Sequence, residues 1–507
     1  MSARLRLAGL LALLLLLAGC AHRLPPAPAD PPSVPADSGE LAARVATLDL
    51  AEDESVYRLV AGSEAAFVHR MSTAAKASAH LDLQYYLWHD DLTGRLLAGE
   101  LLAAAERGVR VRVLIDDLQH RGMDARLLPL DAHPNLEIRL FNPFRSRASL
   151  LGNAVEFIGS GGRQNHRMHN KLWIADGRIA LVGGRNIGDE YFGAHTGFNF
   201  DDLGVLLAGA AVREAAEQFE RYWDHPLAVP LTTLARPRDR DRVDPQPALD
   251  AHRREAQDSA YVLRLREQAA AGAFELTPET LFRGRQVRMI ADDPDKALGR
   301  AAAPRQLRRE IGELLVSTQT ELLLVSPYFV PGRRGSAALI DVAGHARVRV
   351  LTNALAANDV AAVHGGYSRW RPPLLAAGIE LYELRPTSAP PRGSLGRSQA
   401  SLHSKALVAD RTRSYIGSFN FDPRSARINT ENGVLIDDPA FTAELLRQLE
   451  PALEPARSWQ VTLRDGRLRW DGTVDGRPVQ HRRDPEASFG RRFTALLFRW
   501  LPFDSQL

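Results

Sequence analysis

The sequence predicts an α/β fold in which one layered unit is used twice along the 507 residues. Strand-like apolar segments alternate with helical segments, and the same order of segments recurs in both halves of the chain. Each half also carries one copy of the pattern H-x-K-x4-D. Because alternating strands and helices are typical of domains in which helices cover a sheet, we expect two such domains.

Short apolar segments define the expected strands. In the first half a helical segment at 96–107 ends at Gly108, a residue type that favours helix C-termini. This helix lies between the first two of three predicted strands, at 81–87, 109–115 and 138–141. The second half repeats this order, with predicted strands at 321–325, 348–351 and 379–384.

The N-terminus resembles the signal of a bacterial lipoprotein. Arg4 and Arg6 precede an apolar run at 7–18 that is short for a membrane span, and the sequence Leu-Ala-Gly-Cys follows it, ending at Cys20. Cys20 is the only cysteine, so it can form no intramolecular disulfide, and the resemblance implies that it carries lipid. By resemblance to the sorting rule of such lipoproteins, Ala21 after the cysteine implies an outer-membrane location, facing the periplasm. The alternative is an ordinary secretory signal or an uncleaved anchor.

Composition marks the boundaries between segments. Residues 24–39 are rich in Pro, Ala and Ser, and residues 230–258 are rich in charge and Pro, as linkers and surface excursions are. Asp465-Gly466 predicts a C-terminal hairpin, and the final apolar stretch predicts a helix that packs on the body or, less favoured, lies on a membrane. We therefore expect a signal peptide at 1–19, a Pro-rich linker at 20–40, a first lobe at 41–229, a linker or surface excursion at 230–280, a second lobe at 281–457, and a hairpin and helix at 458–507.

The charge balance argues against a dedicated nucleic-acid binder. The net charge is only +3 and the isoelectric point is about 9.1, whereas nucleic-acid binders concentrate positive charge on one face. Nearly all the basic residues are Arg, and a compact ammonium is therefore kept at few positions. Two of the four lysines lie two residues after a histidine; the lysines are Lys76, Lys171, Lys296 and Lys405.

Each H-x-K-x4-D motif predicts a strand that presents its His and Lys on one face. In the first copy His169 and Lys171 share a face, because side chains alternate along a strand. Asp176 then starts a turn, and a returning strand leads to Asn186. The second copy has the same order of residues: His403, Lys405, Asp410, Gly417, Ser418 and Asn420.

These residue types suit phosphodiester transfer. The transition state spreads negative charge over phosphate oxygens, which Lys, Asn and Ser side chains can stabilise. One imidazole can attack phosphorus and form a phosphohistidine. A second imidazole can protonate the leaving alkoxide and then deprotonate the incoming alcohol or water. This scheme requires no metal and no other cofactor.

The motifs resemble the signature of the phospholipase D superfamily, H-x-K-x4-D-x6-G-S-x-N. The second copy matches it fully, and the first departs at Gly184, where the family often has Ser. The resemblance also implies a downstream acid that orients each histidine, for which Glu431 and Asp202 fit. Asp176 and Asp410 belong to the motif, but Asp at a tight turn favours a structural role over a chemical one.

Further segments resemble the cardiolipin synthase group, most of all its C-type branch. They are QYYLW at 84–88, RGVRVRVLIDD at 107–117, SPYFVPG at 326–332 and LTNALAANDVAAVHGGY at 351–367. The resemblance implies transfer of a phosphatidyl group between phospholipids to give cardiolipin. Two alternatives stay open. One is a phospholipase D or other phosphodiester hydrolase, with a nuclease disfavoured by the weak basicity; the other is a non-catalytic phospholipid-binding envelope lipoprotein.

The resemblance implies two phospholipase-D-like α/β/α lobes related by a pseudo-twofold axis, with one active site at their interface. His169 is then the expected nucleophile and His403 the general acid and base. One chain, and so a monomer, suffices for such a site. Its partners are phospholipid substrates and, through lipidated Cys20, a membrane. The residues expected to hold the substrate phosphate are Lys171, Lys405, Asn186, Ser418 and Asn420.

Overall fold

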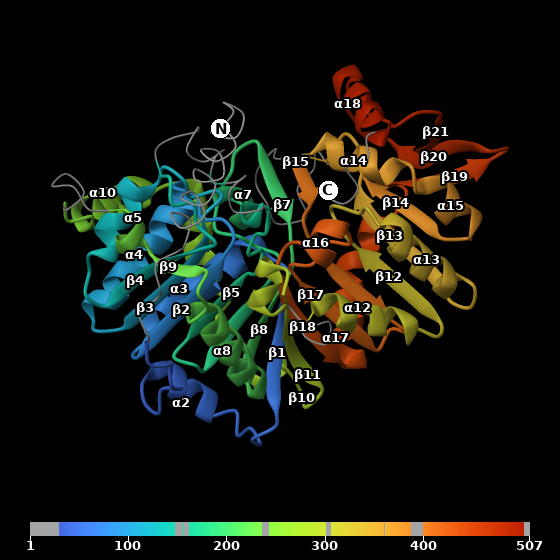
Figure 1. The fold of residues 1–507 in the computed structure, drawn as a ribbon. Helices are drawn as coiled ribbons and strands as arrows, with labels where there is room; N and C mark the ends of the chain where they lie inside the picture. Colours follow the sequence, from blue (N-terminus) through green and yellow to red (C-terminus); the bar gives the residue numbers. More distant parts are fainter. Residues whose placement is uncertain are drawn as a thin grey trace, which may run out of the picture.

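The computed structural model describes residues 30–147, 156, 162–235, 243–300, 306–358, 360–386 and 399–500. Cys20, the predicted signal peptide and residues 20–29 of the predicted Pro-rich linker lie outside these residues. In the described part, two large sheets flanked by helices lie side by side (Figure 1). Among the described helices, none has the length and apolar character needed to cross a membrane.

The first lobe is built on a nine-stranded sheet with the order β10-β1-β8-β6-β5-β2-β3-β4-β9. Its strands are β1 (Ser55–Val60), β2 (His80–Tyr85), β3 (Arg110–Asp116), β4 (Leu136–Phe141), β5 (Leu172–Ala175), β6 (Ile179–Gly183), β8 (Gly204–Gly209), β9 (Ala228–Pro230) and β10 (Phe282–Gly284). Its helices are α2 (Glu40–Ala46), α3 (Ser63–Lys76), α4 (Leu92–Glu106), α5 (Asp124–Asp131), α7 (Asp189–Phe192), α8 (Ala210–Trp223), α9 (Leu231–Leu234), α10 (Gln246–Ala256) and α11 (Ala260–Ala270).

The second lobe is built on a ten-stranded sheet with the order β11-β18-β17-β16-β12-β13-β14-β19-β20-β21. Its strands are β11 (Val287–Ala291), β12 (Glu321–Val325), β13 (Arg347–Asn353), β14 (Glu380–Leu384), β16 (Ala406–Ala409), β17 (Arg413–Gly417), β18 (Asn432–Asp437), β19 (Ser458–Arg464), β20 (Arg467–Val474) and β21 (Arg477–His481). Its helices are α12 (Leu307–Val316), α13 (Gly332–Ala343), α14 (Ala361–Ser368), α15 (Arg371–Ala376), α16 (Pro423–Arg427), α17 (Pro439–Leu449) and α18 (Phe489–Trp500).

The two sheets repeat one topology. The order β1-β8-β6-β5-β2-β3-β4-β9 in the first lobe matches β11-β18-β17-β16-β12-β13-β14-β19 in the second. In each lobe the three predicted strands are parallel neighbours, β2-β3-β4 and β12-β13-β14, and the motif strand pairs antiparallel to the first of them. The duplicated α/β fold expected from the sequence is therefore confirmed.

The lobes share an apolar core and exchange reciprocal contacts. One buried cluster joins Val182 and Val205 of the first sheet to Ile416 and Val434 of the second. The helix α8 packs on β11 of the other lobe, and α17 packs on β1. A small parallel sheet also crosses the boundary, formed by β7 (Phe198–Asp201) and β15 (Gln399–Leu402). Burial of this shared core fixes the two lobes against each other.

Several segments outside the repeated unit differ from the simple expectation. Residues 246–270, expected as a linker or surface excursion, form α10 and α11, which pack on α4 and α3. The strand β10, expected in the second lobe, extends the first sheet. The hairpin at Asp465-Gly466 forms between β19 and β20, with both turn residues at positive φ, and β19 joins it to the second sheet through β14.

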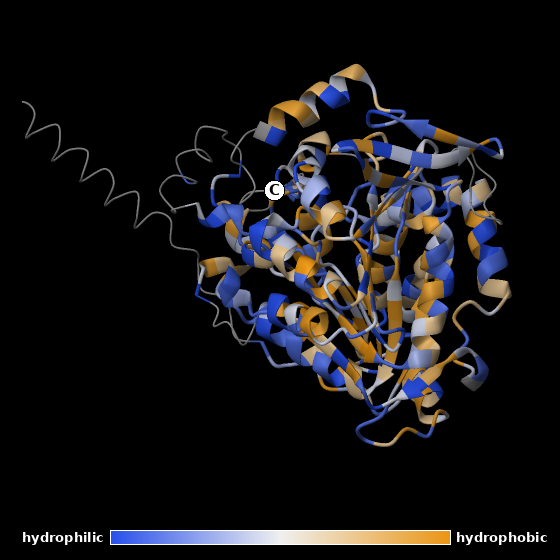
Figure 2. Cartoon of the chain, turned by 90° about the vertical axis from the view of Figure 1, so that its right-hand side faces the viewer, coloured by the Kyte–Doolittle hydropathy of each residue, from blue (hydrophilic) through white to orange (hydrophobic). Residues whose placement is uncertain are grey.

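The C-terminal helix α18 packs on α14 and leaves apolar side chains exposed. A Cβ added to Gly365 would lie 2.5 Å from the Ala495 carbonyl oxygen, so the two helices approach closely. The opposite side carries Phe489, Phe493, Leu496 and Leu497, each at least 50% exposed. In Figure 2 this helix lies at the top of the molecule, and hydrophobic and hydrophilic segments alternate along it. It therefore has a packed face and an apolar face turned to solvent.

Candidate active site

The two H-x-K segments meet where the lobes join. The sequence predicts that His169 and Lys171 lie within a strand, but β5 begins only at Leu172, and β16 begins at Ala406. The preceding residues instead bond to the other lobe: His169 N donates to Thr430 O at 2.9 Å, and His403 N donates to Asp201 O at 2.8 Å. Each motif is thus held in place by the opposite lobe.

The two histidines exchange acidic partners across the lobe boundary. Nδ1 of His169 in the first lobe lies 2.8 Å from Glu431 Oε2 in the second. Nδ1 of His403 in the second lobe lies 2.5 Å from Asp202 Oδ2 in the first. Both carboxylates are fully buried. Because each Nδ1 faces its acid, each ring leaves Nε2 for a substrate.

The two motif lysines are buried beside the histidines. Lys171 and Lys405 are each 1% exposed, and their Nζ atoms donate to the carbonyl oxygens of His169 and His403. Burial holds the pKa of Lys171 well below its ordinary value, and the nearby charge of Lys405 lowers it further. A bound anion would favour the charged form of both lysines, so this pair of buried amines favours the binding of a phosphate.

The motif amides lie in the same site with unsatisfied atoms. Asn186 and Asn420 are buried, and the Oδ1 atom of each has no hydrogen-bond partner in the described structure. Asn186 Nδ2 donates to Tyr191 OH at 2.9 Å. Buried polar atoms without partners are rare in folded proteins. Each unpaired Oδ1 is an acceptor, and a turn of the amide about its last bond would place the Nδ2 donor there for a phosphate oxygen.

Ser418 contacts the orienting acid rather than facing empty space. Its Oγ donates to Glu431 Oε2 and accepts from Asn432 N at 3.0 Å. The sequence predicts this hydroxyl as a phosphate ligand. In the structure it is already engaged in holding the acid that holds His169.

Gly184, where the first motif departs from the family pattern, lies against Asp202. A Cβ at this position would lie 2.3 Å from Asp202 Oδ1, closer than any real contact. The Asp202 carboxylate is itself fixed by His403 and by Leu203 N, which donates to it at 2.8 Å. Glycine is thus the residue that leaves room for the acid.

Asp176 and Asp410 cap strands at the far end of the motif. Asp176 accepts backbone N–H bonds from Ser78, Ala79 and His80 at 2.8–3.2 Å. Asp410 accepts equivalent bonds from residues 319–321 at 2.7–3.2 Å. Both lie at positive φ, at 54°. This geometry is that of a structural turn residue.

The two acid–histidine pairs differ electrostatically. Burial raises the pKa of Glu431 to about 7. Burial also acts to raise the pKa of Asp202, but His403 and Lys405 outweigh it and hold that pKa below its ordinary value. Burial lowers the pKa of His403 to about 4 and holds that of His169 well below its ordinary value. Asp202 is therefore a full anion near neutral pH, and Glu431 is not.

Aromatic rings and one amide complete the site and were not identified from the sequence. Tyr86 meets the His169 ring edge-on at 5.1 Å between centroids, and Tyr191 meets His403 in the same way at 5.2 Å. Asn432 brackets the Lys171 backbone, accepting from its N at 3.0 Å and donating to its O at 3.2 Å. The only sequence signal for Asn432 is its place directly after the orienting acid.

Comparisons with known proteins agree with this geometry. The family model described as "Cardiolipin synthase, PLD-like domain" matches residues 71–223 and 311–452. Cardiolipin synthase C of Escherichia coli K12 is 39% identical over 447 residues, covering 87% of this chain and 93% of that protein. The major cardiolipin synthase ClsA of Bacillus subtilis is 25% identical over 80% of this chain and 70% of its own length.

A solved structure shares the fold. The phosphatidylserine synthase of Haemophilus influenzae matches with a TM-score of 0.54 at 17% identity, covering 80% of this chain and 87% of that one. The residues that the family model matches include both motifs and the two acids that contact the histidines, Asp202 and Glu431. The chain belongs to the cardiolipin synthase family of phospholipase-D-like proteins.

Proposed function

We propose that this enzyme makes cardiolipin by moving a phosphatidyl group from one phospholipid to the alcohol of another, through a phosphohistidine. Family membership supports phosphatidyl transfer. The observation that carries the proposed mechanism is the pair of histidines from different lobes, each oriented by an acid from the opposite lobe. One chain supplies the whole site, so a monomer suffices.

The proposed reaction has two displacements. Nε2 of His169 attacks the donor phosphorus and forms a P–N bond, the bond from phosphorus to the headgroup oxygen breaks, and His403 protonates that oxygen. The acceptor hydroxyl then attacks phosphorus, gives its proton to His403, and the P–N bond breaks. Lys171, Lys405, Asn186 and Asn420 stabilise the charge on the phosphate oxygens.

The different acids support this division of roles. An ionised Asp202 favours the imidazolium form of His403, which the acid in the first step requires. In the empty site, burial lowers the pKa of His403 to about 4. The negative charge of a bound phosphodiester raises this pKa and so increases the fraction of His403 in the imidazolium form. The acid beside His169, Glu431, has a pKa of about 7 and is only partly ionised near neutral pH. It therefore stabilises an imidazolium less than Asp202 does, and His169 can attack phosphorus as the neutral base.

We also propose that the enzyme works at a membrane surface, anchored by lipid on Cys20 at the outer membrane and facing the periplasm. Its substrates are membrane lipids, and the exposed apolar face of α18 fits an interfacial contact. A chain of contacts connects α18 to the site. Arg491 Nη1 donates to Leu355 O at 3.0 Å. Two residues earlier in the chain, Asn353 at the end of β13 donates through Nδ2 to Leu402 O at 2.9 Å, beside His403.

The test uses purified protein and acyl-labelled phosphatidylglycerol or phosphatidylethanolamine, with products separated by thin-layer chromatography. Cardiolipin supports the synthase, phosphatidic acid alone indicates the hydrolase, and no product in detergent or vesicles indicates a lipid-binding lipoprotein. His169→Ala and His403→Ala should each abolish turnover, since both lobes build one site. Substantial activity in either variant would contradict the shared site.

A further inference from the structure

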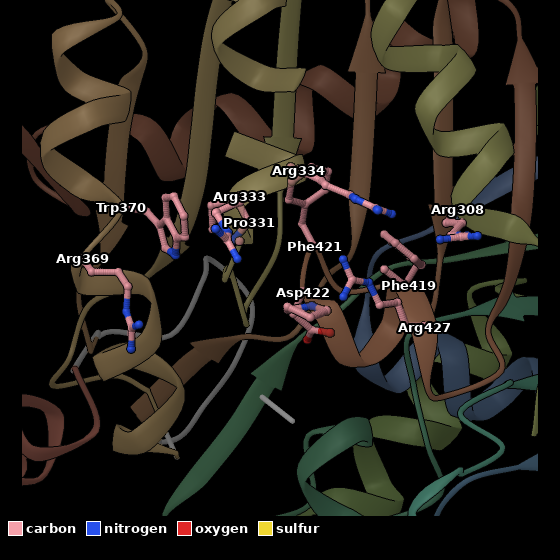
Figure 3. Close-up of a pocket in the computed structure, with 14 residues that line it drawn as sticks. Arg308, Pro331, Arg333, Arg334, Arg369, Trp370, Phe419, Phe421, Asp422 and Arg427 are labelled. Carbon is pink, nitrogen blue, oxygen red and sulfur yellow. The ribbon is translucent and has the colours of Figure 1, made fainter. Parts of the chain in front are cut away.

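A large arginine-lined cavity opens on the second lobe. Its volume is about 930 Å³, and Figure 3 shows guanidinium groups from three helices and the segment before α15 around it. Arg308 comes from α12, Arg333 and Arg334 from α13, and Arg427 from α16. The remaining charged and aromatic lining residues are Arg369, Trp370, Phe419, Phe421 and Asp422.

Four of the five arginines that line this cavity have no partner side chain among the described residues. No ion pair or hydrogen bond joins Arg308, Arg333, Arg334 or Arg427 to another side chain in the described residues. Among the described residues that line the cavity, the only acid is Asp422, and burial raises its pKa to about 7, so it offsets little of the positive charge. Trp370 Nε1 is also buried without an acceptor. The cavity therefore has an excess of cations and hydrogen-bond donors.

The position of two of these arginines is unfavourable without an anion. Arg333 and Arg334 lie in the first turn of α13, which has no acidic residue in that turn. The N-terminus of a helix carries a partial positive charge, so it repels cations. An anion between the helix N-terminus and these side chains would reverse the sign of that interaction.

The cavity adjoins the catalytic site. Phe419 and Phe421, which line it, are the chain neighbours of Asn420. Asp422 lies close enough to Glu431, the partner of His169, for the charge of Glu431 to raise its pKa. The helix α16 contributes Arg427 to the cavity, and the charge of Arg424 in the same helix lowers the pKa of His169. A ligand in the cavity is thus a neighbour of the reacting phosphate.

We propose that this cavity binds the phosphate of the acceptor, an anionic phospholipid such as phosphatidylglycerol, while its free hydroxyl reaches the phosphohistidine. The inference rests on the proposed function. Cardiolipin contains two phosphates joined through one glycerol, and the histidine site holds only one of them. In the second displacement the acceptor hydroxyl oxygen bonds to phosphorus, its proton goes to His403, and the P–N bond to His169 breaks.

The test compares an acceptor that carries a phosphate with one that does not. Full-length wild type and Arg333→Gln/Arg334→Gln receive the same acyl-labelled donor in mixed micelles, with either phosphatidylglycerol or ethanol as acceptor. The double variant should need about tenfold or more phosphatidylglycerol for half-maximal cardiolipin formation, because charge-assisted contacts to phosphate are lost. Transfer to ethanol, seen as phosphatidylethanol, should stay within about twofold of wild type.

Control variants distinguish a failure of this inference from a failure of the proposed function. Arg254 and Arg266 are exposed on α10 and α11, so Arg254→Gln/Arg266→Gln removes the same charge far from the cavity and should match wild type with both acceptors. Equal losses with both acceptors, or no loss with either, would overturn the acceptor site. If wild type itself makes neither cardiolipin nor phosphatidylethanol, the proposed function fails instead.

Discussion

Gly184 occupies the position at which the second lobe has Ser418, and the space beside it is filled by Asp202. The two lobes therefore fill the space beside this motif position with different groups. In the second lobe the motif Ser donates to Glu431, whereas in the first the acid moves into the place of the Ser side chain. The asymmetry lies where the two histidines are expected to differ in role.

Gly184→Ser should impair catalysis by displacing Asp202. The added Cβ would lie 2.3 Å from Asp202 Oδ1, and that carboxylate is held by His403 at 2.5 Å. We expect kcat to fall by about tenfold or more, with a smaller change in KM, because a small displacement of an orienting group is costly in the transition state. Gly312→Ser, at a helix position with open space, is the matched control. Wild-type kcat in Gly184→Ser would contradict this packing argument.

Glu431 should give the folded protein a distinctive pH dependence. Its pKa is about 7 when folded, against 4.5 for the free side chain, so the unfolded chain releases this proton at lower pH. The contribution of Glu431 to stability is therefore present below pH 4.5 and is lost as pH rises toward 7. Relative to Glu431→Gln, wild type should lose up to about 3 kcal/mol of unfolding free energy across this range.

Chemical denaturation at a series of pH values measures this difference. The substitution also removes contacts to His169 and Ser418, so the readout is the slope against pH rather than the stability at one pH. Glu255→Gln, at an exposed position on α10, controls for loss of a carboxylate. Parallel profiles for wild type and Glu431→Gln would show that Glu431 does not titrate as described.

At the scale of elements, apolar periodicity predicted the central strands, and burial explains the success. The strands β2, β3, β12 and β13 are buried along most of their length. The sequence of β12 is a nearly continuous apolar run, whereas in the other three strands apolar residues recur at alternate positions. The helices α10 and α11 were missed because a segment rich in charge and Pro precedes them, and because each fully buries only one residue, Ala256 or Tyr261. The sequence did not predict that each histidine contacts the acid of the other lobe, because a local sequence pattern does not show which lobe a side chain contacts.

The apolar face of α18 should matter only when the substrate is in a bilayer. Phe493 and Leu497 are 58% and 50% exposed, so replacing them removes little packing within the protein. Phe493→Glu/Leu497→Glu should lower activity on phospholipid vesicles about tenfold or more, through lost apolar contact with the bilayer. Activity on short-chain phospholipids dissolved as monomers, and the thermal midpoint, should stay near wild type.

A second pair of exposed apolar residues supplies the control for α18. Leu263 and Val316 are 45% and 69% exposed on α11 and α12, so Leu263→Glu/Val316→Glu makes the same chemical change elsewhere. If both double variants lose vesicle activity equally, general charge rather than the α18 face is responsible.

At the scale of the whole molecule, the lobe boundary is part of the catalytic machinery. Tyr57 OH donates to Asp438 at 2.6 Å, and Tyr222 OH donates to Asp292 O at 2.7 Å, each across the boundary. Together with the shared apolar core, these contacts hold each histidine against an acid that belongs to the other lobe. A rigid boundary keeps both acids in place without a closing motion, which is the preorganisation that charge stabilisation requires.

The division of roles between the lobes predicts a dependence on the leaving group. If His403 with Asp202 protonates the departing headgroup, a leaving group that needs no proton should bypass both residues. With phosphatidyl-p-nitrophenol, His403→Ala and Asp202→Asn should release one equivalent of p-nitrophenolate at a rate within about tenfold of wild type. With phosphatidylglycerol as donor, both variants should react about 100-fold or more slowly than wild type.

His169→Ala should give no burst with either donor, because it removes the nucleophile, and Glu431→Gln should be slowed alike with both. Stopped-flow absorbance measures the burst, and thin-layer chromatography measures the natural reaction. The reverse pattern, in which His169→Ala is spared and His403→Ala is silent, would exchange the two roles while leaving the shared site intact.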